Sequence, residues 1–177
     1  MRAIVVYESM YGNTRHVAEA VARGLGNGEE VQVLPVLDAA AVDPGDYDLV
    51  VVGGPTHMHG MSRESTRHAA AEAADSSAGH LVMEPDAASE GVREWINALA
   101  GIPGRAAAFD TRIDAAALLT GRASRGIDRH LRSAGFTMLA PPESFLVGSK
   151  DTHLLPGEET RARAWGESLA AMVRTAT

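Results

Sequence analysis

The chain is 177 residues long, the size of one domain with a substantial core, so we expect a single domain over 1–177. It contains no cysteine, which excludes disulfide bonds, thiolate nucleophiles and cysteine-ligated metal centres. The net charge of −7, with no basic cluster visible along the sequence, argues against nucleic acid as a partner. No apolar stretch approaches the roughly 20 residues of a membrane span, and no export signal is visible, so we expect a cytoplasmic protein without a membrane partner.

The first half of the chain alternates predicted strands with a predicted helix. Residues 3–7 form an unbroken apolar run, which is typical of a strand buried on both faces. Apolar residues at helical spacing follow, and this helix should end in the glycine-rich residues 24–28. Two more strands are predicted at 31–36 and 49–52. Because Pro35 cannot donate a ladder hydrogen bond, the first of these two strands is expected at an edge of the sheet.

The middle of the chain is less regular. Residues 62–74 are rich in alanine and predict a helix, whereas 75–88 shows no regular pattern. A helix is then expected after Ser89, which has the side chain of a typical N-cap residue. Trp95 falls on the apolar face of this helix, and core packing is its expected role.

The last part of the chain returns to regular alternation. A fourth strand is predicted at 105–109 and a fifth at 136–147, with a helix between them and an interruption of the fifth strand at Pro141-Pro142. The final helix is expected to open near 156–158. Its predicted inner face consists of Trp165, Leu169, Met172 and Val173.

Strands that alternate with helices indicate an α/β fold with a parallel sheet and right-handed crossovers. In such sheets, ligands bind beyond the carboxyl ends of the strands, near the point where the strand order reverses. The functional loops are therefore expected at 8–14, 53–62 and 109–120.

The first of these loops has the residue types of a phosphate cradle. Ser9, Asn13 and Thr14 can donate hydrogen bonds, and Gly12 lets the backbone curl closely where a helix N-terminus supplies further N–H groups. The alternative is an ordinary strand-to-helix turn with a capping hydroxyl. A Walker motif and a glycine-rich dinucleotide turn are both absent, and Gly53 to Pro55 replace the aspartate that a receiver domain needs at the end of its third strand.

The sequence around this loop resembles a known family. Residues 5–21, Val-Val-Tyr-Glu-Ser-Met-Tyr-Gly-Asn-Thr-Arg-His-Val-Ala-Glu-Ala-Val, match the flavodoxin signature at every specified position. Gly-Gly-Pro-Thr at 53–56 resembles the second flavin loop of flavodoxin-like proteins, and Phe-Asp-Thr-Arg at 109–112 stands where the third begins. With 60–63 and 143–147, the chain resembles a flavodoxin-like subgroup of high-GC bacteria.

The resemblance implies a three-layer flavodoxin-like α/β fold, in which a five-stranded parallel sheet of order 2-1-3-4-5 carries helices on both faces. It also implies non-covalently bound FMN. The residues implied to bind the FMN phosphate are Ser9, Met10, Tyr11, Gly12, Asn13 and Thr14. The residues implied to flank the two sides of the flavin ring are Pro55, Thr56, His57, Met58, His59 and Gly60 on one side and Phe109, Asp110, Thr111 and Arg112 on the other.

Only 5% of the residues are aromatic, whereas typical flavodoxins sandwich the ring between aromatic side chains. If Arg112 lies near the ring, its charge stabilises the reduced anion and raises the potential; alternatively, it pairs with Asp110 or Asp114 at the surface. His57 could make the redox chemistry depend on pH. The pair His57 and His59 has no companion carboxylate or cysteine, so no metal is expected.

Three functions remain open for such a protein. The favoured one is an FMN-binding carrier that mediates electron transfer between partner redox proteins, a reductase and an acceptor, with no catalytic residue of its own. The second is an NAD(P)H-dependent quinone-type reductase, in which residues 57–62 form a substrate wall and Arg63 and Arg67 attract a cofactor phosphate. The third is a binding domain that has lost FMN. A monomer or a weak homo-oligomer is expected.

Overall fold

The computed structural model describes most of the chain. The described residues are 1–26, 30–57, 60–68, 72, 83–84, 87, 89–99, 101–116, 120–149 and 153–175. Residues 64–68 are helical, as expected for the segment at 62–74. The rest of that predicted helix and most of the stretch at 75–88 lie outside the described residues. Within the described ranges, no helix is both long and apolar enough to span a membrane.

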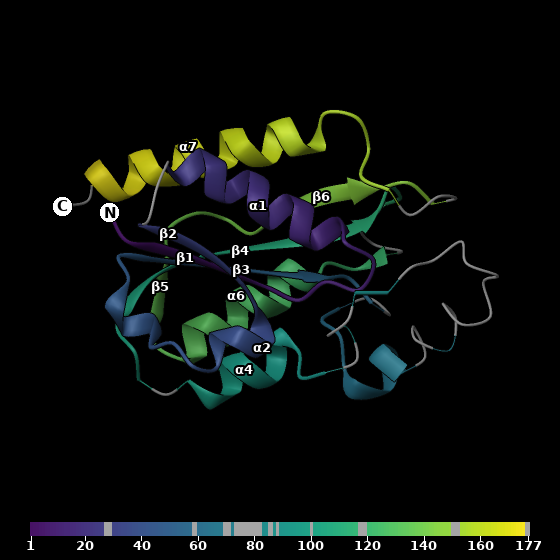
Figure 1. Cartoon of the computed structure of the whole chain (residues 1–177), viewed down its shortest axis with the longest axis horizontal. Coiled ribbons are helices and arrows are strands. Elements are labelled where there is room, and N and C mark those ends of the chain that lie inside the picture. The colour runs from purple at the N-terminus through teal and green to yellow at the C-terminus, as the bar shows by residue number, and fades with distance from the viewer. Residues whose placement is uncertain are drawn as a thin grey trace.

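One parallel sheet forms the centre of the molecule, with the strand order β2-β1-β3-β4-β5 (Figure 1). This order confirms the implied topology and the edge position of the strand that contains Pro35. Tyr7, at the end of β1, lies opposite Pro35 on one side and Gly53 on the other. The strands are β1 (Ala3–Tyr7), β2 (Val31–Pro35), β3 (Leu49–Pro55), β4 (Gly104–Ile113), β5 (Phe136–Met138) and β6 (Glu143–Val147).

The predicted fifth strand is two strands, so the sheet has six strands instead of five. β5 pairs with the beginning of β4, and β6 pairs with its end, from Phe109 to Ile113. Pro141 and Pro142 separate the two because a proline cannot donate a ladder hydrogen bond. β4 is correspondingly longer than the predicted 105–109, and its second half includes polar residues that pair with β6.

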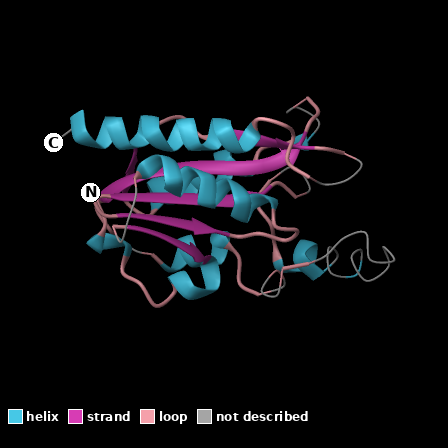
Figure 2. Cartoon of the chain, turned by 45° about the horizontal axis from the view of Figure 1, so that its top comes forward, coloured by secondary structure: helices cyan, strands magenta, loops and turns pink. Residues whose placement is uncertain are grey.

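Helices cover both faces of the sheet and give the expected three layers (Figures 1 and 2). Two helices lie on one face, α1 (Asn13–Leu25) and α7 (Glu158–Thr175). The other face carries α2 (Val36–Ala39), α4 (Val92–Ala98) and α6 (Ala123–Ser133), and a short 3-10 turn, η1 (Pro44–Asp46), precedes β3. The N-terminus and the last turn of α7 lie at one end of the sheet, opposite the loops that follow β1, β3 and β4 (Figure 1).

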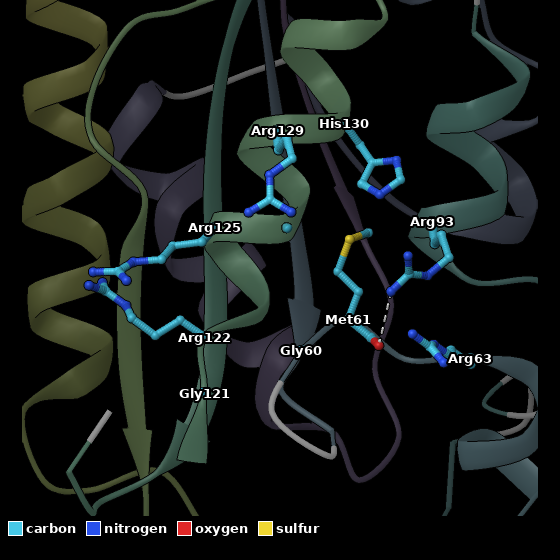
Figure 3. A pocket seen from close by; sticks show the side chains of 10 residues that line it. Gly60, Met61, Arg63, Arg93, Gly121, Arg122, Arg125, Arg129 and His130 are labelled. Carbon is cyan, nitrogen blue, oxygen red and sulfur yellow. Dashed lines mark hydrogen bonds between the residues drawn. The ribbon is translucent and has the colours of Figure 1, made fainter. Parts of the chain in front are cut away.

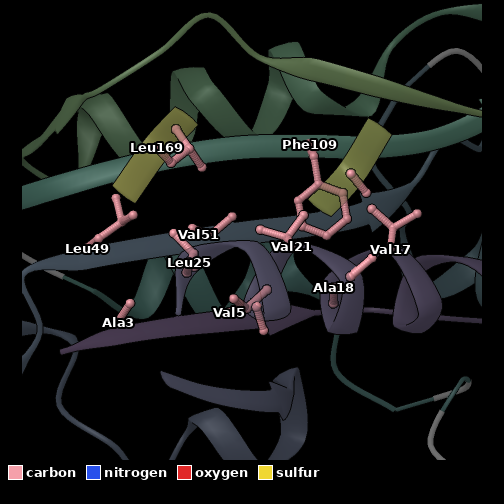
Figure 4. Packing of buried hydrophobic residues seen from close by; sticks show 14 of the residues in the cluster. Ala3, Val5, Val17, Ala18, Val21, Leu25, Leu49, Val51, Phe109 and Leu169 are labelled. Carbon is pink, nitrogen blue, oxygen red and sulfur yellow. The ribbon is translucent and has the colours of Figure 1, made fainter. Parts of the chain in front are cut away.

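Two hydrophobic cores follow from the alternation of side chains along the strands. Val5 and Val51 face α1 and α7, whereas Val6 and Val52 face α4 and α6. Figure 4 shows the first of these cores, in which the apolar face of α1 packs on the sheet. A strand buried on both faces needs apolar residues at every position, which explains the unbroken apolar runs in the sequence.

The two helices of the first face approach each other closely. A Cβ atom at Gly24 of α1 would overlap the backbone carbonyl oxygen of Arg163, and one at Gly166 of α7 would overlap that of Val21. These glycines therefore allow the backbones of α1 and α7 to meet without an intervening side chain.

Two predicted helix features are wrong. α4 begins after Gly91, and the Glu94 carboxylate accepts a hydrogen bond from the Gly91 N–H at 3.0 Å, so the helix does not begin at Ser89 as expected. Met172 is 40% exposed and does not belong to the inner face of α7. The predicted core positions of Trp95 and Trp165 are confirmed: Trp95 is buried, and Trp165 packs edge-on against Phe109.

Candidate functional site

The three predicted loops meet at the carboxyl edge of the sheet, because β1, β3 and β4 are neighbours. A cavity of about 150 Å³ opens between them. Its lining residues are Met10, Tyr11, Asn13, Thr14, Pro55, Thr56, His57, Thr111, Arg112, Ile113 and Val147. All of these except Ile113 and Val147 are among the residues that the family resemblance implied. Ile113 lies in the predicted loop at 109–120 and Val147 ends the predicted strand at 136–147, but neither residue was assigned to the site.

The first loop turns sharply at Gly12 into the N-terminus of α1. Gly12 has a φ of 87°, in the left-handed region that favours glycine, and it has no side chain to cap the helix. Its N–H donates to Ser9 Oγ at 3.1 Å. The first N–H groups of a helix have no partner inside the helix, so α1 presents donors and the positive end of its dipole to this loop. Thr14 lies in this first turn.

Thr14 joins the first loop to the third. Its Oγ1 forms a hydrogen bond of 2.8 Å with Oγ1 of Thr111, and both side chains are buried. A hydroxyl both donates and accepts, so Thr14 can give a second hydrogen bond to a ligand at the helix N-terminus only if Thr111 acts as donor to it.

A carboxylate lies over this loop. Glu84 Oε1 lies 3.3 Å from the position that a Cβ of Gly12 would occupy, and it accepts a hydrogen bond from Arg15 Nε at 3.2 Å. The Glu84 N–H donates to the carbonyl of Met10 at 2.8 Å. An anionic group therefore already stands at the N-terminus of α1, which is the arrangement that the helix dipole favours.

The second loop turns back on itself directly after Pro55. His57 and Gly60 exchange two backbone hydrogen bonds of 2.9 Å, while Met58 and His59 lie outside the described residues. Burial lowers the pKa of His57, which favours a neutral imidazole beside the cavity. Thr56 lines the cavity, and its Oγ1 accepts a hydrogen bond from the N–H of Ala123 at 3.0 Å.

The third predicted segment is part of β4, so its side chains alternate between the two faces. Phe109 lies fully buried in the core on the α1 side and does not line the cavity. Asp110 points to the other face, where its Oδ2 accepts a hydrogen bond of 2.7 Å from the N–H of Ser124 at the start of α6. Both side chains are therefore structural, whereas Thr111 and Arg112 reach the cavity.

Arg112 is held by backbone carbonyls. Its Nη1 donates to the carbonyl oxygens of Ile113 at 3.2 Å and Ala115 at 2.7 Å. The alternative in which Arg112 pairs with Asp110 or Asp114 is not observed in the described part of the chain, where Arg112 has no carboxylate partner. Its positive charge therefore stays at the rim of the cavity.

A buried polar network directly behind the first loop was missed by the sequence analysis. Glu8 is 4% exposed, and its Oε2 accepts a hydrogen bond from the Val92 N–H at 3.1 Å. Arg67 is 3% exposed; its Nη1 lies 3.3 Å from Glu94 Oε2 and 3.2 Å from Ser62 Oγ. These internal contacts make Arg67 unavailable to a cofactor phosphate. The alternative in which Arg67 attracts the phosphate of NAD(P)H is therefore not supported at this residue.

Burial raises the pKa of Glu8, although its hydrogen bonds to Ser62 and Val92 and the positive charge of Arg67 oppose the shift. A single glutamate at the end of a strand gives no sequence signal for such burial.

As to metals, the described residues contain no group of three or more histidine and carboxylate side chains that could hold an ion.

The fold and the site define a flavodoxin-like α/β protein. A family model for flavodoxin matches residues 5–95, just over half of the chain, and the chain belongs to this family. No curated protein matches the sequence.

Solved structures of flavodoxins resemble the whole chain. A flavodoxin from the domain Archaea is 22% identical, with a TM-score of 0.60 over 98% of this chain and 99% of that one. Flavodoxin 1 from Bacillus cereus is 16% identical, with a TM-score of 0.60 over 100% and 99% of the two chains. A flavodoxin, WrbA-like protein from Agrobacterium tumefaciens is 17% identical, with a TM-score of 0.56 over 99% of each. At these identities the likeness shows the fold.

The donor set of the first loop fits a phosphate group. Ser9, Gly12 and Thr14 surround the N-terminus of α1, and the Glu84 carboxylate shows that the loop accommodates an anion there. The neighbouring cavity has apolar walls from Met10, Pro55, Ile113 and Val147, which suit one face and edge of a flat ring. The residues present therefore fit the two chemically different ends of FMN.

Proposed function

We propose that this protein binds FMN and carries electrons between two partner proteins, a reductase that delivers them and an acceptor that takes them. Flavodoxin family members bind flavin, typically FMN. The observation that carries the proposal for this chain is the phosphate loop, in which the left-handed Gly12 leads into the N-terminus of α1 beside Ser9 and Thr14.

The chain's own residues divide into two groups with different tasks. The residues from Ser9 to Thr14 would hold the phosphate through backbone N–H groups and hydroxyls. Pro55 to Gly60, with Thr111 and Arg112, would hold the ring. Phe109 and Asp110 support the site from the core and from the start of α6.

Bound FMN supplies the redox chemistry, and the protein sets its orientation and electrostatic surroundings. Arg112 adds a positive charge at the cavity rim, and His57 stays neutral because burial lowers its pKa. A positive charge stabilises a ligand that gains negative charge more than the same ligand when neutral. We therefore propose a moderate reduction potential for this protein and not a very low one.

The test is anaerobic reduction of the FMN-loaded protein. The loss of flavin absorbance measures the extent of reduction. A carrier is expected to stay oxidised with NADPH or NADH alone and to become reduced once a flavodoxin reductase is added. Fast reduction by NADPH alone would contradict the carrier proposal and favour the direct NAD(P)H-dependent reductase. Free FMN at the same concentration is the control for reduction of unbound flavin.

A further inference from the structure

A second cavity, of about 660 Å³, lies beyond the second loop, between that loop and helices α4 and α6. Five of its lining residues are arginines, namely Arg63, Arg93, Arg122, Arg125 and Arg129 (Figure 3). We call it the arginine cavity. No basic cluster is visible along the sequence, because these arginines are far apart in the chain and converge only in the fold.

Three segments supply these side chains. Arg122, Arg125 and Arg129 are spaced by three and four residues, which places them on one face at the start and along the length of α6. Arg93 comes from α4, and Arg63 precedes the helical residues 64–68. Figure 3 shows the Met61 side chain between the arginines of α6 on one side and Arg63 and Arg93 on the other.

The charges of the arginine cavity have no carboxylate ion-pair partners among the described residues. In the part of the chain that the structure describes, none of the five arginines forms an ion pair, whereas Arg132, on the same helix, pairs with Asp128. Arg93 donates instead to the carbonyl oxygens of Ser62 and Met61, at 3.3 and 3.4 Å. These contacts fix the guanidinium without neutralising it.

Arg122 is anchored in the same way, because Nε donates to Ser144 Oγ at 2.9 Å and Nη2 to the carbonyl of Pro142 at 3.2 Å. Like charges three or four residues apart destabilise a helix, so the arrangement on α6 costs stability while no anion is bound. Burial and the positive charges of Arg93 and Arg129 lower the pKa of His130, which lines the same cavity.

The volume and the chemistry point to a small ligand. Pockets for small molecules span roughly 300–1000 Å³, and the arginine cavity falls inside this range. Guanidinium groups match the geometry of phosphate oxygens and bind them with two parallel hydrogen bonds. The chain as a whole carries a net charge of −7, so a long polyanion that extended beyond the cavity would meet an acidic protein.

We propose that the arginine cavity binds a small anion with two or more phosphate groups, of the nucleoside diphosphate class. The arginines that line the cavity supply the donors for these phosphate groups. The site is separate from the phosphate loop at Gly12, and the proposal does not rest on the proposed function. It is, however, adjacent to the candidate flavin site, because a smaller cavity lined by His57, Met61, Arg63 and Arg93 lies at the second loop.

The experiment is a calorimetric titration of the full chain with ADP, repeated with saturating FMN. We expect one ADP per chain, weaker binding of AMP, no binding of adenosine, and weaker binding of ADP when salt rises from about 50 to about 200 mM. The double variant Arg125→Gln/Arg129→Gln should raise the Kd of ADP about tenfold or more. Both side chains are exposed and the substitutions remove two like charges from α6, so the variant should unfold at or slightly above the wild-type temperature.

The matched control is Arg132→Gln/Arg174→Gln, which removes the same charge from two exposed positions outside the cavity. It should leave the Kd of ADP within about twofold of the wild-type value. Absence of ADP binding, equal binding of adenosine, or equal loss of affinity in both double variants would overturn the proposal. Loss of ADP binding in the presence of FMN would also overturn it, since ADP would then occupy the phosphate loop. A chain that binds ADP but not FMN would contradict only the proposed function.

Discussion

At the scale of single residues, the phosphate loop attracts an anion and also contains a carboxylate that competes with it. The N-terminus of α1 and the left-handed turn at Gly12 favour an anion, and the Glu84 carboxylate already stands there, paired with Arg15. A phosphate that enters the loop must therefore displace a like charge. Its gain over Glu84 comes from its larger charge and its additional acceptor oxygens.

We expect Glu84→Gln to tighten FMN binding, because the substitution removes the competing charge and frees Arg15 to pair with the phosphate. The Kd of FMN should fall about threefold to fivefold, the range of a partly exposed charge interaction. Quenching of flavin fluorescence during titration measures the change. Glu19→Gln is the control, since Glu19 also pairs with Arg15, at 3.6 Å, but its carboxylate does not lie at Gly12. Weaker FMN binding by Glu84→Gln would contradict this view of the loop.

The buried carboxyl of Glu8 leads to a second prediction at this scale, on the pH dependence of stability. Burial raises its pKa in the folded protein, so the folded chain binds a proton at this carboxyl more tightly than the unfolded chain does. The free energy of unfolding should therefore decrease as pH rises from about 4.3, the usual glutamate value, through the raised pKa of Glu8. Above that raised pKa the loss is complete.

Glu8→Gln should remove this part of the pH dependence while retaining an acceptor for the Val92 N–H. Urea unfolding of the wild type and the variant between about pH 4 and pH 8 measures it, and the variant should gain stability relative to the wild type as pH rises. The exposed Glu167→Gln should keep the wild-type slope. Parallel pH profiles for Glu8→Gln and the wild type would show that burial of Glu8 does not shift its pKa.

At the scale of elements, the packing of α1 on α7 depends on glycine. A Cβ at Gly166 would overlap the carbonyl oxygen of Val21, and backbone cannot move aside as a flexible side chain can. We expect Gly166→Ala to lower the free energy of unfolding by about 1–3 kcal/mol, although alanine favours helix more than glycine does. Urea denaturation measures this, with Ser168→Ala on the exposed face of α7 as the control. An unchanged or higher stability of Gly166→Ala would contradict the close contact.

The elements also show where prediction from sequence stops. Apolar runs and helical spacing predicted β1, β3, α1 and α6, because buried strands and amphipathic helices leave a periodic pattern. The pattern does not mark the end of β4, which continues through Asp110 and Arg112 because β6 pairs with it. The family resemblance implied that Phe109 flanks the flavin ring, whereas its position in the middle of β4 places its side chain in the core.

At the scale of the whole molecule, the alternation of strands and helices predicted the three loops, and the family resemblance implied the sheet order, which the structure confirms. The arginine cavity could not be predicted in this way. Arg63, Arg93 and Arg122 are about 30 residues apart in sequence and meet only through the fold. The spacing of Arg122, Arg125 and Arg129 was the one local signal, since it indicates a charged face on a single helix.

The central claim is that the phosphate loop and the adjoining cavity bind FMN. The most direct test is a titration of the purified protein with FMN, in which visible absorption measures binding. Saturable binding of one FMN per chain is expected, with a shifted flavin spectrum. Thr14→Val should weaken that binding about tenfold, because it removes a hydroxyl from the first turn of α1. Thr137→Val, on an exposed position of β5, should not. Absence of saturable binding in the wild type, or equal affinity in Thr14→Val, would contradict the account.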